Sequence, residues 1–199
     1  MTVPGTFDTS ARELIHAGLQ NLDEARSLFR QLAASGFDAA RCGLLLDALQ
    51  HVCDPDVALR NLVDIVNAQV SQGRALDDIM PDDTAFRQLV AVLGVSDAMG
   101  KLMRFRPDLV QTAATDHCNS HLYNHDQRRA HVLESVGADP NDRMSPTATM
   151  DLADAATALR RTYRNQLAAI IAQDTMSDDP IALQPRISSE LSDLADAGP

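Results

Sequence analysis

The sequence predicts an all-α fold, an irregular multi-helix bundle of about eight to ten helices. Hydrophobic residues make up 45% of the 199 residues, which is enough to build a buried core. Aromatic residues are only 4% and Trp is absent, so the residues that favour strands are scarce. Apolar residues also recur at helical spacing along most of the chain, between residues that cap helices.

The first part of the chain reads as a series of amphipathic helices. Residues 1–9 are expected to be a flexible terminus. Ser10, Asn21 and Asp54 each precede an apolar run and can accept a hydrogen bond from a helix amide. The expected spans are residues 10–19, 22–36, 39–52 and 55–70. The third of these is apolar around much of its circumference and is therefore expected to be the central helix.

Residues 72–81 form a polar break and are the best linker candidate. We therefore expect one helical domain over residues 10–199, or two packed subdomains over residues 10–72 and 82–199.

The stretch from residue 82 to residue 110 is predicted to form two short helices that meet at a tight corner. Asp82 or Asp83 can cap the first helix, and Gly94 is expected to end it with a positive φ angle. Ser96 can cap the next helix, and Pro107 opens a third segment. Neither short helix would persist in water without neighbours to pack against.

The second half of the chain is predicted to be helical at residues 107–114 and 127–136, with Gly137 closing the latter. Residues 141–146 read as a loop, and a long helix is expected over residues 147–174. After a break at residues 177–180, a last helix carries Ile187, Leu191 and Leu194.

Charge and cysteine content limit the classes of function. A net charge of −11 argues against binding to nucleic acid or to anionic membranes. The three cysteines, Cys42, Cys53 and Cys118, do not suggest a disulfide framework. No leader sequence and no run of 18 apolar residues occurs, so a soluble, cytoplasmic protein is expected.

Several motifs carry a resemblance to a known family. Residues 89–107, with the pattern Leu-Gly-x-Ser-x-x-Met-Gly … Pro, resemble the amino-terminal part of the glutamine synthetase adenylyltransferase/adenylyl-removing enzymes. Residues 28–70, Gly137-Ala138-Asp139-Pro140, residues 158–174 and residues 191–197 are similar to other segments of that family, in the same order. The chain departs from the family at Ala169, where a basic residue is usual.

The resemblance implies a helical segment that buttresses the adenylyl-removing nucleotidyltransferase half of the enzyme. The parent enzyme uses ATP and magnesium, modifies a tyrosine of glutamine synthetase and responds to a PII-type regulator. Its catalytic motif, a Gly-Ser followed by Asp-x-Asp, is missing here and is expected beyond Pro199. We therefore predict no catalytic and no cofactor-binding residue in this segment, which alone is expected to be inactive. Its partners would be the nucleotidyltransferase domain and, in addition, glutamine synthetase or the regulator.

Two short motifs have a structural interpretation that outweighs the chemical one. Asp54-Pro55-Asp56 is the one Asp-x-Asp in the chain, but its Pro and its place at a helix start favour capping over metal binding. Ser96 lies in a sequence close to a Gly-x-Ser-x-Gly nucleophile elbow. The elbow needs a strand in front of it, so we interpret Ser96 as a helix cap.

Two side-chain groups are weak candidates for binding. His117, His121 and His125 would line one face of a helix and could hold zinc, although adventitious binding is the favoured interpretation. Arg160, Arg161 and Arg164, with Arg128 and Arg129 earlier, could contact an anion or a partner. A solvated face paired with the many Asp residues is the favoured interpretation of these arginines.

Two alternatives to the enzyme segment follow from the same residues. One is a freestanding helical module for protein interaction. The other is a small metal-binding helical protein built on the histidine cluster.

Overall fold

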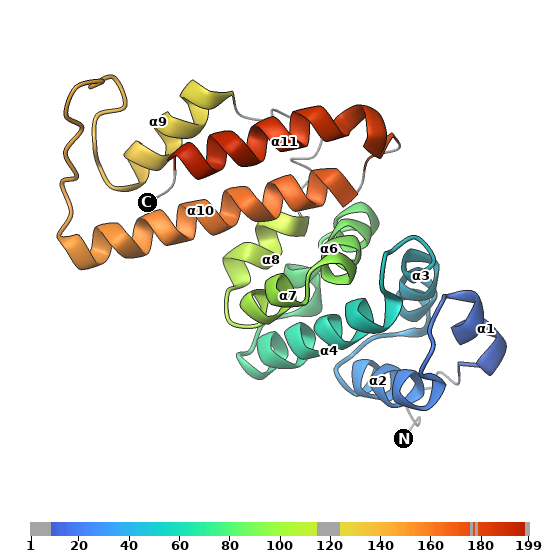
Figure 1. Cartoon of the computed structure of the whole chain (residues 1–199). Coiled ribbons are helices and arrows are strands. Elements are labelled where there is room, and N and C mark those ends of the chain that lie inside the picture. Colours follow the sequence, from blue (N-terminus) through green and yellow to red (C-terminus); the bar gives the residue numbers. More distant parts are fainter. Residues whose placement is uncertain (1–8, 115–123, 176, 178, 198–199) are drawn as a thin grey trace. The chain divides into compact units, whose positions relative to one another are not determined.

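The computed structural model describes residues 9–114, 124–175, 177 and 179–197, and every regular element in this part of the chain is a helix (Figure 1). The all-α prediction is therefore confirmed. The chain divides into two compact units, residues 1–116 and residues 117–199. None of the described helices is both long and apolar enough to cross a membrane.

The first unit contains helices α1 to α8. Their bounds are α1 Ala11–His16, α2 Leu22–Ala34, α3 Ala39–Leu49, α4 Pro55–Ser71, α5 Leu76–Ile79, α6 Asp83–Val95, α7 Asp97–Met103 and α8 Pro107–Ala114. The predicted caps are confirmed, because each accepts a hydrogen bond from an amide in the first turn of its helix. They are Ser10, Asn21, Asp54, Asp82 and Ser96.

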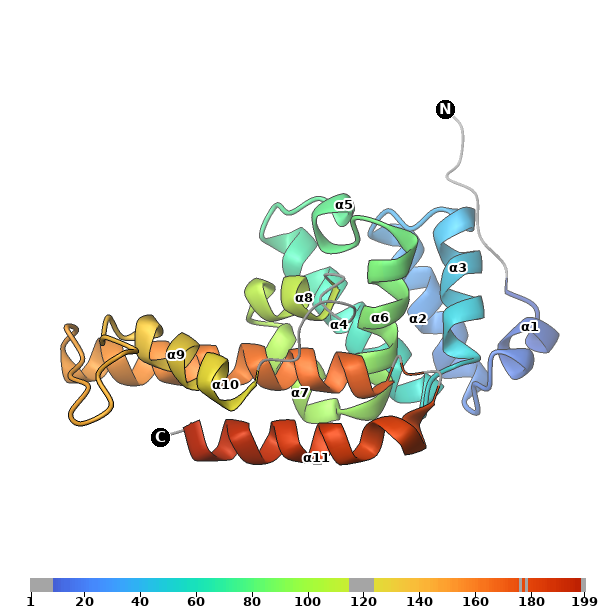
Figure 2. The same ribbon diagram turned by 90° about the horizontal axis from the view of Figure 1, so that it is seen from above.

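Helices α4 and α6 form the centre of the first unit and pack closely against each other (Figures 1 and 2). Nine of the thirteen residues of α6 are buried, and α3, α7 and α8 pack against it. The expectation that the helix at residues 39–52 is central is therefore wrong. That helix is shorter, ending at Leu49, and its apolar residues pack onto the outside of the α4–α6 pair.

The polar break at residues 72–81 lies within the first unit. It contains the short helix α5, which packs against α4 and α8. Ile79 and Met80 are only 1% and 8% exposed. These two buried side chains attach the stretch to the first unit. The sequence did not indicate this, because the residues around them are polar. Of the predicted flexible terminus, residues 1–8 lie outside the described residues, and the side chain of Thr9 is buried.

The second unit contains α9 His125–Ser135, α10 Leu152–Thr175 and α11 Pro180–Ala197. α10 runs along α11, and α9 packs against both (Figures 1 and 2). One small core joins Ile170 of α10 to Ile187 and Leu194 of α11. Another joins Val136 and Ala138 to the first turns of α10.

Each of these three helices begins at a different residue from the one predicted, and α9 begins at His125 instead of residue 127, with Asn124 as its cap. The long helix begins at Leu152 instead of residue 147, because the Asp151 carboxylate accepts hydrogen bonds from the amides of Ala153 and Asp154, both at 3.0 Å. The last helix begins at Pro180, inside the predicted break. Pro suits a first helical turn, and the Asp179 carboxylate accepts from an amide of that turn.

Candidate functional site

The corner between α6 and α7 carries the most characteristic motif of the sequence. Gly94 was expected to end the first helix with a positive φ angle, and this is wrong: it lies inside α6 and is not among the glycines with positive φ. A Cβ on Gly94 would lie 3.0 Å from Cβ of Val52 and 3.3 Å from the carbonyl oxygen of Asp54. Glycine avoids crowding here, because α6 approaches that loop closely.

Ser96 caps α7, as predicted. Its backbone is extended, with φ −138° and ψ 100°, and its hydroxyl accepts a hydrogen bond from the amide of Met99 at 3.2 Å. A helix precedes it and another follows, so the strand that a nucleophile elbow requires is replaced by α6. Ser96 therefore stabilises the turn between α6 and α7 as a helix cap.

Gly100 makes room for a buried polar side chain. A Cβ at this position would lie 2.3 Å from Cγ of Asn61. Asn61 is 6% exposed, and its Nδ2 donates to the carbonyl oxygen of Leu93 at 3.1 Å. That carbonyl is in the last turn of α6, where helix oxygens lack intrahelical partners. Asn61 thus ties α4 to the end of α6, and the motif glycine permits it.

The Asp54-Pro55-Asp56 sequence has two structural roles. Asp54 Oδ1 accepts a hydrogen bond from the amide of Val57 at 3.0 Å and caps α4, as predicted. Asp56 Oδ2 accepts from the amide of Gln20 at 3.0 Å and so holds the connection between α1 and α2. The two carboxylates therefore serve different backbone segments.

The histidine cluster is described only in part, because His117 and His121 lie outside the described residues. His125 is the first residue of α9, and its Nδ1 lies 3.3 Å from Oδ1 of Asp193 in α11. Asn124 is extended and caps α9, whose first residue is His125. Within the described ranges no three His, Cys, Asp or Glu side chains are grouped to hold a metal ion. The three-histidine site stays a prediction.

The candidate arginines lie on α10. Arg160 and Arg161 are exposed and Arg164 is half-buried. At about 100° per residue, the three positions fall within about 100° of the helix surface. An anion or partner contact at this face stays a prediction.

The prediction that Arg128 lies on a solvated face is wrong. Arg128 is 1% exposed and forms a buried ion pair with Glu190 of α11. Its Nη1 also donates to Oε1 of Gln166 in α10 at 2.8 Å. One guanidinium therefore joins the three described helices of the second unit. The sequence held a signal for this pair, because Glu190 interrupts the apolar spacing of Ile187 and Leu194.

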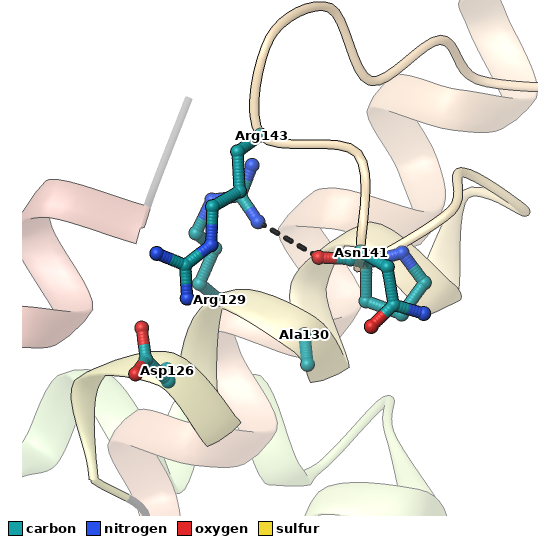
Figure 3. A pocket seen from close by; sticks show the side chains of 6 residues that line it. Asp126, Arg129, Ala130, Asn141 and Arg143 are labelled. Atoms are coloured by element: carbon teal, nitrogen blue, oxygen red, sulfur yellow. Dashed lines mark hydrogen bonds between the residues drawn. The ribbon is translucent and has the colours of Figure 1, made fainter.

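A polar hollow of about 410 Å³ opens in the second unit (Figure 3). It is lined by Asp126, Arg129, Ala130, Pro140, Asn141 and Arg143. The residues come from α9 and from the loop between α9 and α10. Asp126, Arg129 and Arg143 lie on one side of the hollow, and Asn141 lies on the other (Figure 3).

Arg129 fastens this loop to α9. Its Nη1 donates to the carbonyl oxygen of Pro140 and its Nη2 to that of Asp142, each at 3.1 Å. Hydrogen bonds from the amides of Ser145 and Met144 lower the pKa of Asp142 and tighten the same loop. The other two charged residues of the hollow, Asp126 and Arg143, are opposite in sign. The lining therefore does not present a set of like charges to a ligand of one charge.

The chain is similar to bifunctional glutamine synthetase adenylyltransferase/adenylyl-removing enzymes. The enzyme of Bifidobacterium longum strain DJO10A is 62% identical over 191 residues, which cover 96% of this chain and 18% of that protein. The enzyme of Leifsonia xyli is 30% identical over 185 residues, 92% of this chain and 17% of that protein. The enzyme of Streptomyces avermitilis is 28% identical over 202 residues, 99% of this chain and 18% of that protein.

These similarities confirm the resemblance that the motifs indicated. The chain matches a segment of these enzymes and spans about 18% of the length of the Bifidobacterium relatives. No protein-family model matches the chain. No solved structure matches it either.

Proposed function

We propose that this chain is a non-catalytic helical segment from the amino-terminal part of a glutamine synthetase adenylyltransferase/adenylyl-removing enzyme, where it supports the adenylyl-removing half. The observation that carries the proposal is the match to the Bifidobacterium longum enzyme. It is 62% identical over 96% of this chain, and the matched segment makes up only 18% of that enzyme's length. The active enzyme would then need polypeptide that this chain does not contain.

The roles of the motif residues support a scaffold. Each motif residue has a structural role. Gly94 allows α6 to approach the loop before α4, Ser96 caps α7, and Gly100 leaves space for the Asn61 side chain. The one Asp-x-Asp of the chain consists of Asp54 and Asp56, and both carboxylates accept hydrogen bonds from backbone amides. Magnesium in nucleotidyl transfer needs carboxylates that converge on one point, and the described side chains offer no such donor set. We therefore assign ATP and magnesium to other parts of the enzyme.

The partners follow from the same proposal. The segment would pack against the nucleotidyltransferase domain of its enzyme in the cytoplasm. Glutamine synthetase would be the substrate of the whole enzyme, and a PII-type protein its regulator. The exposed arginines Arg160 and Arg161 of α10 are the contacts that we propose for an acidic partner surface.

A segment exchange tests the proposal. In the Bifidobacterium longum enzyme, the matching 191 residues are replaced by this chain. We expect the chimera to adenylylate and deadenylylate glutamine synthetase at rates within about tenfold of the parent, a change of about 1.4 kcal/mol in activation free energy. An enzyme that lacks the segment serves as the control and should lose activity. A chimera that folds and is inactive would refute the proposal.

A further inference from the structure

The last helix of the second unit, α11, has an exposed, uncharged face beside the face that packs against α10. Leu183, Ile187 and Leu194 face α10 and belong to the core that joins the two helices. At about 100° per residue, a second set of residues falls within about 120° of the helix surface, next to that core. This set, called the open face, consists of Ile181, Gln184, Pro185, Ser188, Leu191, Ser192 and Ala195.

The open face is exposed and carries no charge. Ile181 is 83% exposed and Leu191 is 43% exposed, and the other members are exposed as well. All the charged residues of α11 lie outside this face on the helix surface, and they are Arg186, Glu190, Asp193 and Asp196.

The apolar residues of α11 extend much further around the helix than one buried face requires. From Leu183 through Leu191 to Pro185 they span about 200° of the helix surface at about 100° per residue. A helix at the surface of a protein normally has one apolar stripe about 100° wide, with polar and charged residues opposite. This arc also contains Gln184, Ser188 and Ser192 but no charged residue, and an uncharged arc twice the normal width is typical of a helix with packing partners on two sides.

We infer that the open face of α11 docks against polypeptide of the longer enzyme that lies outside this chain. The inference rests on the proposed function. The matched relatives are more than five times as long as the matched segment, so most of such an enzyme is available to cover this face. Because the face offers no charge, the surface that covers it is apolar, with uncharged polar groups opposite Gln184 and the serines.

Cysteine footprinting tests the inference in the chimera described above. Ser188, at the centre of the open face, is changed to Cys in a chain that also carries Cys53→Ser and Cys118→Ser. The matched control is Ala153→Cys, an exposed small residue of α10 in the same unit. Maleimide labelling of each position is followed by peptide mass spectrometry, in the isolated 199-residue chain and in the chimera.

We expect both positions to react at similar rates in the isolated chain. In the chimera, position 188 should react at least about tenfold more slowly, as buried sites do, while position 153 keeps its rate. Equal rates at position 188 in chain and chimera would overturn the inference. Slow labelling of position 188 in the isolated chain would also overturn it. If labelling is slow at every protein concentration, the chain itself covers the face; if it is slow only at high concentration, a second copy of the chain covers it.

A pair of charge substitutions gives a second readout. Ile181→Glu places a carboxylate on the open face, whereas Leu152→Glu makes a similar change in the first turn of α10, at a site that is 88% exposed. In the chimera, Ile181→Glu should lower the midpoint of thermal inactivation and Leu152→Glu should not, while the isolated chain unfolds alike with either. Equal tolerance of both changes in the chimera contradicts the inference. An inactive chimera without substitutions refutes the proposed function as well, whereas an active chimera with a reactive position 188 refutes only the docking face.

Discussion

Replacing Gly100 by Ala should destabilise the first unit, because the new methyl group would occupy the place of Asn61. The added Cβ would lie 2.3, 2.5 and 2.6 Å from Cγ, Nδ2 and Oδ1 of Asn61. The Asn61 side chain would have to leave, and its hydrogen bond to the Leu93 carbonyl, 3.1 Å long, would break. The change therefore acts through a partner on another helix.

The magnitude follows from three contributions. A buried carbonyl without its donor costs about 1–3 kcal/mol. Forcing a methyl group into a packed site costs about 1–3 kcal/mol. Alanine favours the helix over glycine by about 1 kcal/mol, which offsets part of this. We expect a net loss of about 3 kcal/mol of unfolding free energy, which is about a hundredfold change in the opening equilibrium.

Hydrogen exchange of the amides in α4 and α6, read by mass spectrometry, measures this loss, since exchange of core amides follows unfolding of their cooperative unit. We expect Gly100→Ala to speed exchange about a hundredfold. Gly43→Ala is the matched control: Gly43 is also helical, but its added Cβ meets nothing within 4 Å. That change should stabilise the unit by up to about 1 kcal/mol.

A double-mutant cycle isolates the contact with Asn61. In an Asn61→Ala background the three crowded atoms are absent, so Gly100→Ala should cost less than about 1 kcal/mol there. The reasoning is refuted if Gly100→Ala leaves exchange unchanged in the natural chain, or if its cost is the same in both backgrounds.

Three further predictions concern charged and ionisable groups. Glu190→Gln should destabilise the second unit by about 3–5 kcal/mol, because it leaves the buried Arg128 charge without its partner; thermal unfolding of the second unit measures this. The Asp142 pKa is lowered by two loop amides, so the loop should keep its hydrogen bonds as pH falls past the ordinary Asp range and lose them only below the lowered pKa; the NMR shifts of those amides check this. Burial raises the pKa of Cys42 to about 11, so at pH 8 the folded chain should alkylate at the exposed Cys53 well before Cys42, whereas equal rates would contradict the described burial.

Local chemistry made most of the helices predictable from the sequence. Ser96 and Asp82 are short polar residues in front of apolar runs, and capping depends only on the few residues that follow. The last helix begins earlier than predicted because Pro180 can open a helix as well as break one. Such boundaries depend on neighbours within one turn.

The features that the sequence did not reveal depend on contacts between distant residues. A glycine such as Gly94 fits a helix end as well as a close approach, and only the position of Val52 decides between them. Arg128 looks solvated beside Arg129 until α11 brings Glu190 against it. The arginines of α10 were predicted as a group on one helix, and an anion or partner contact at this face stays a prediction.

Turnover by the isolated 199-residue chain is the most direct test of whether this segment is catalytic. The chain is incubated with magnesium, orthophosphate and adenylylated glutamine synthetase, with the Bifidobacterium longum enzyme as the positive control. We expect no ADP above the level without protein, because we propose a scaffold role and because no three His, Cys, Asp or Glu side chains of the described residues are grouped to hold a metal ion. Phosphate-dependent release of ADP in proportion to the amount of this chain would contradict it.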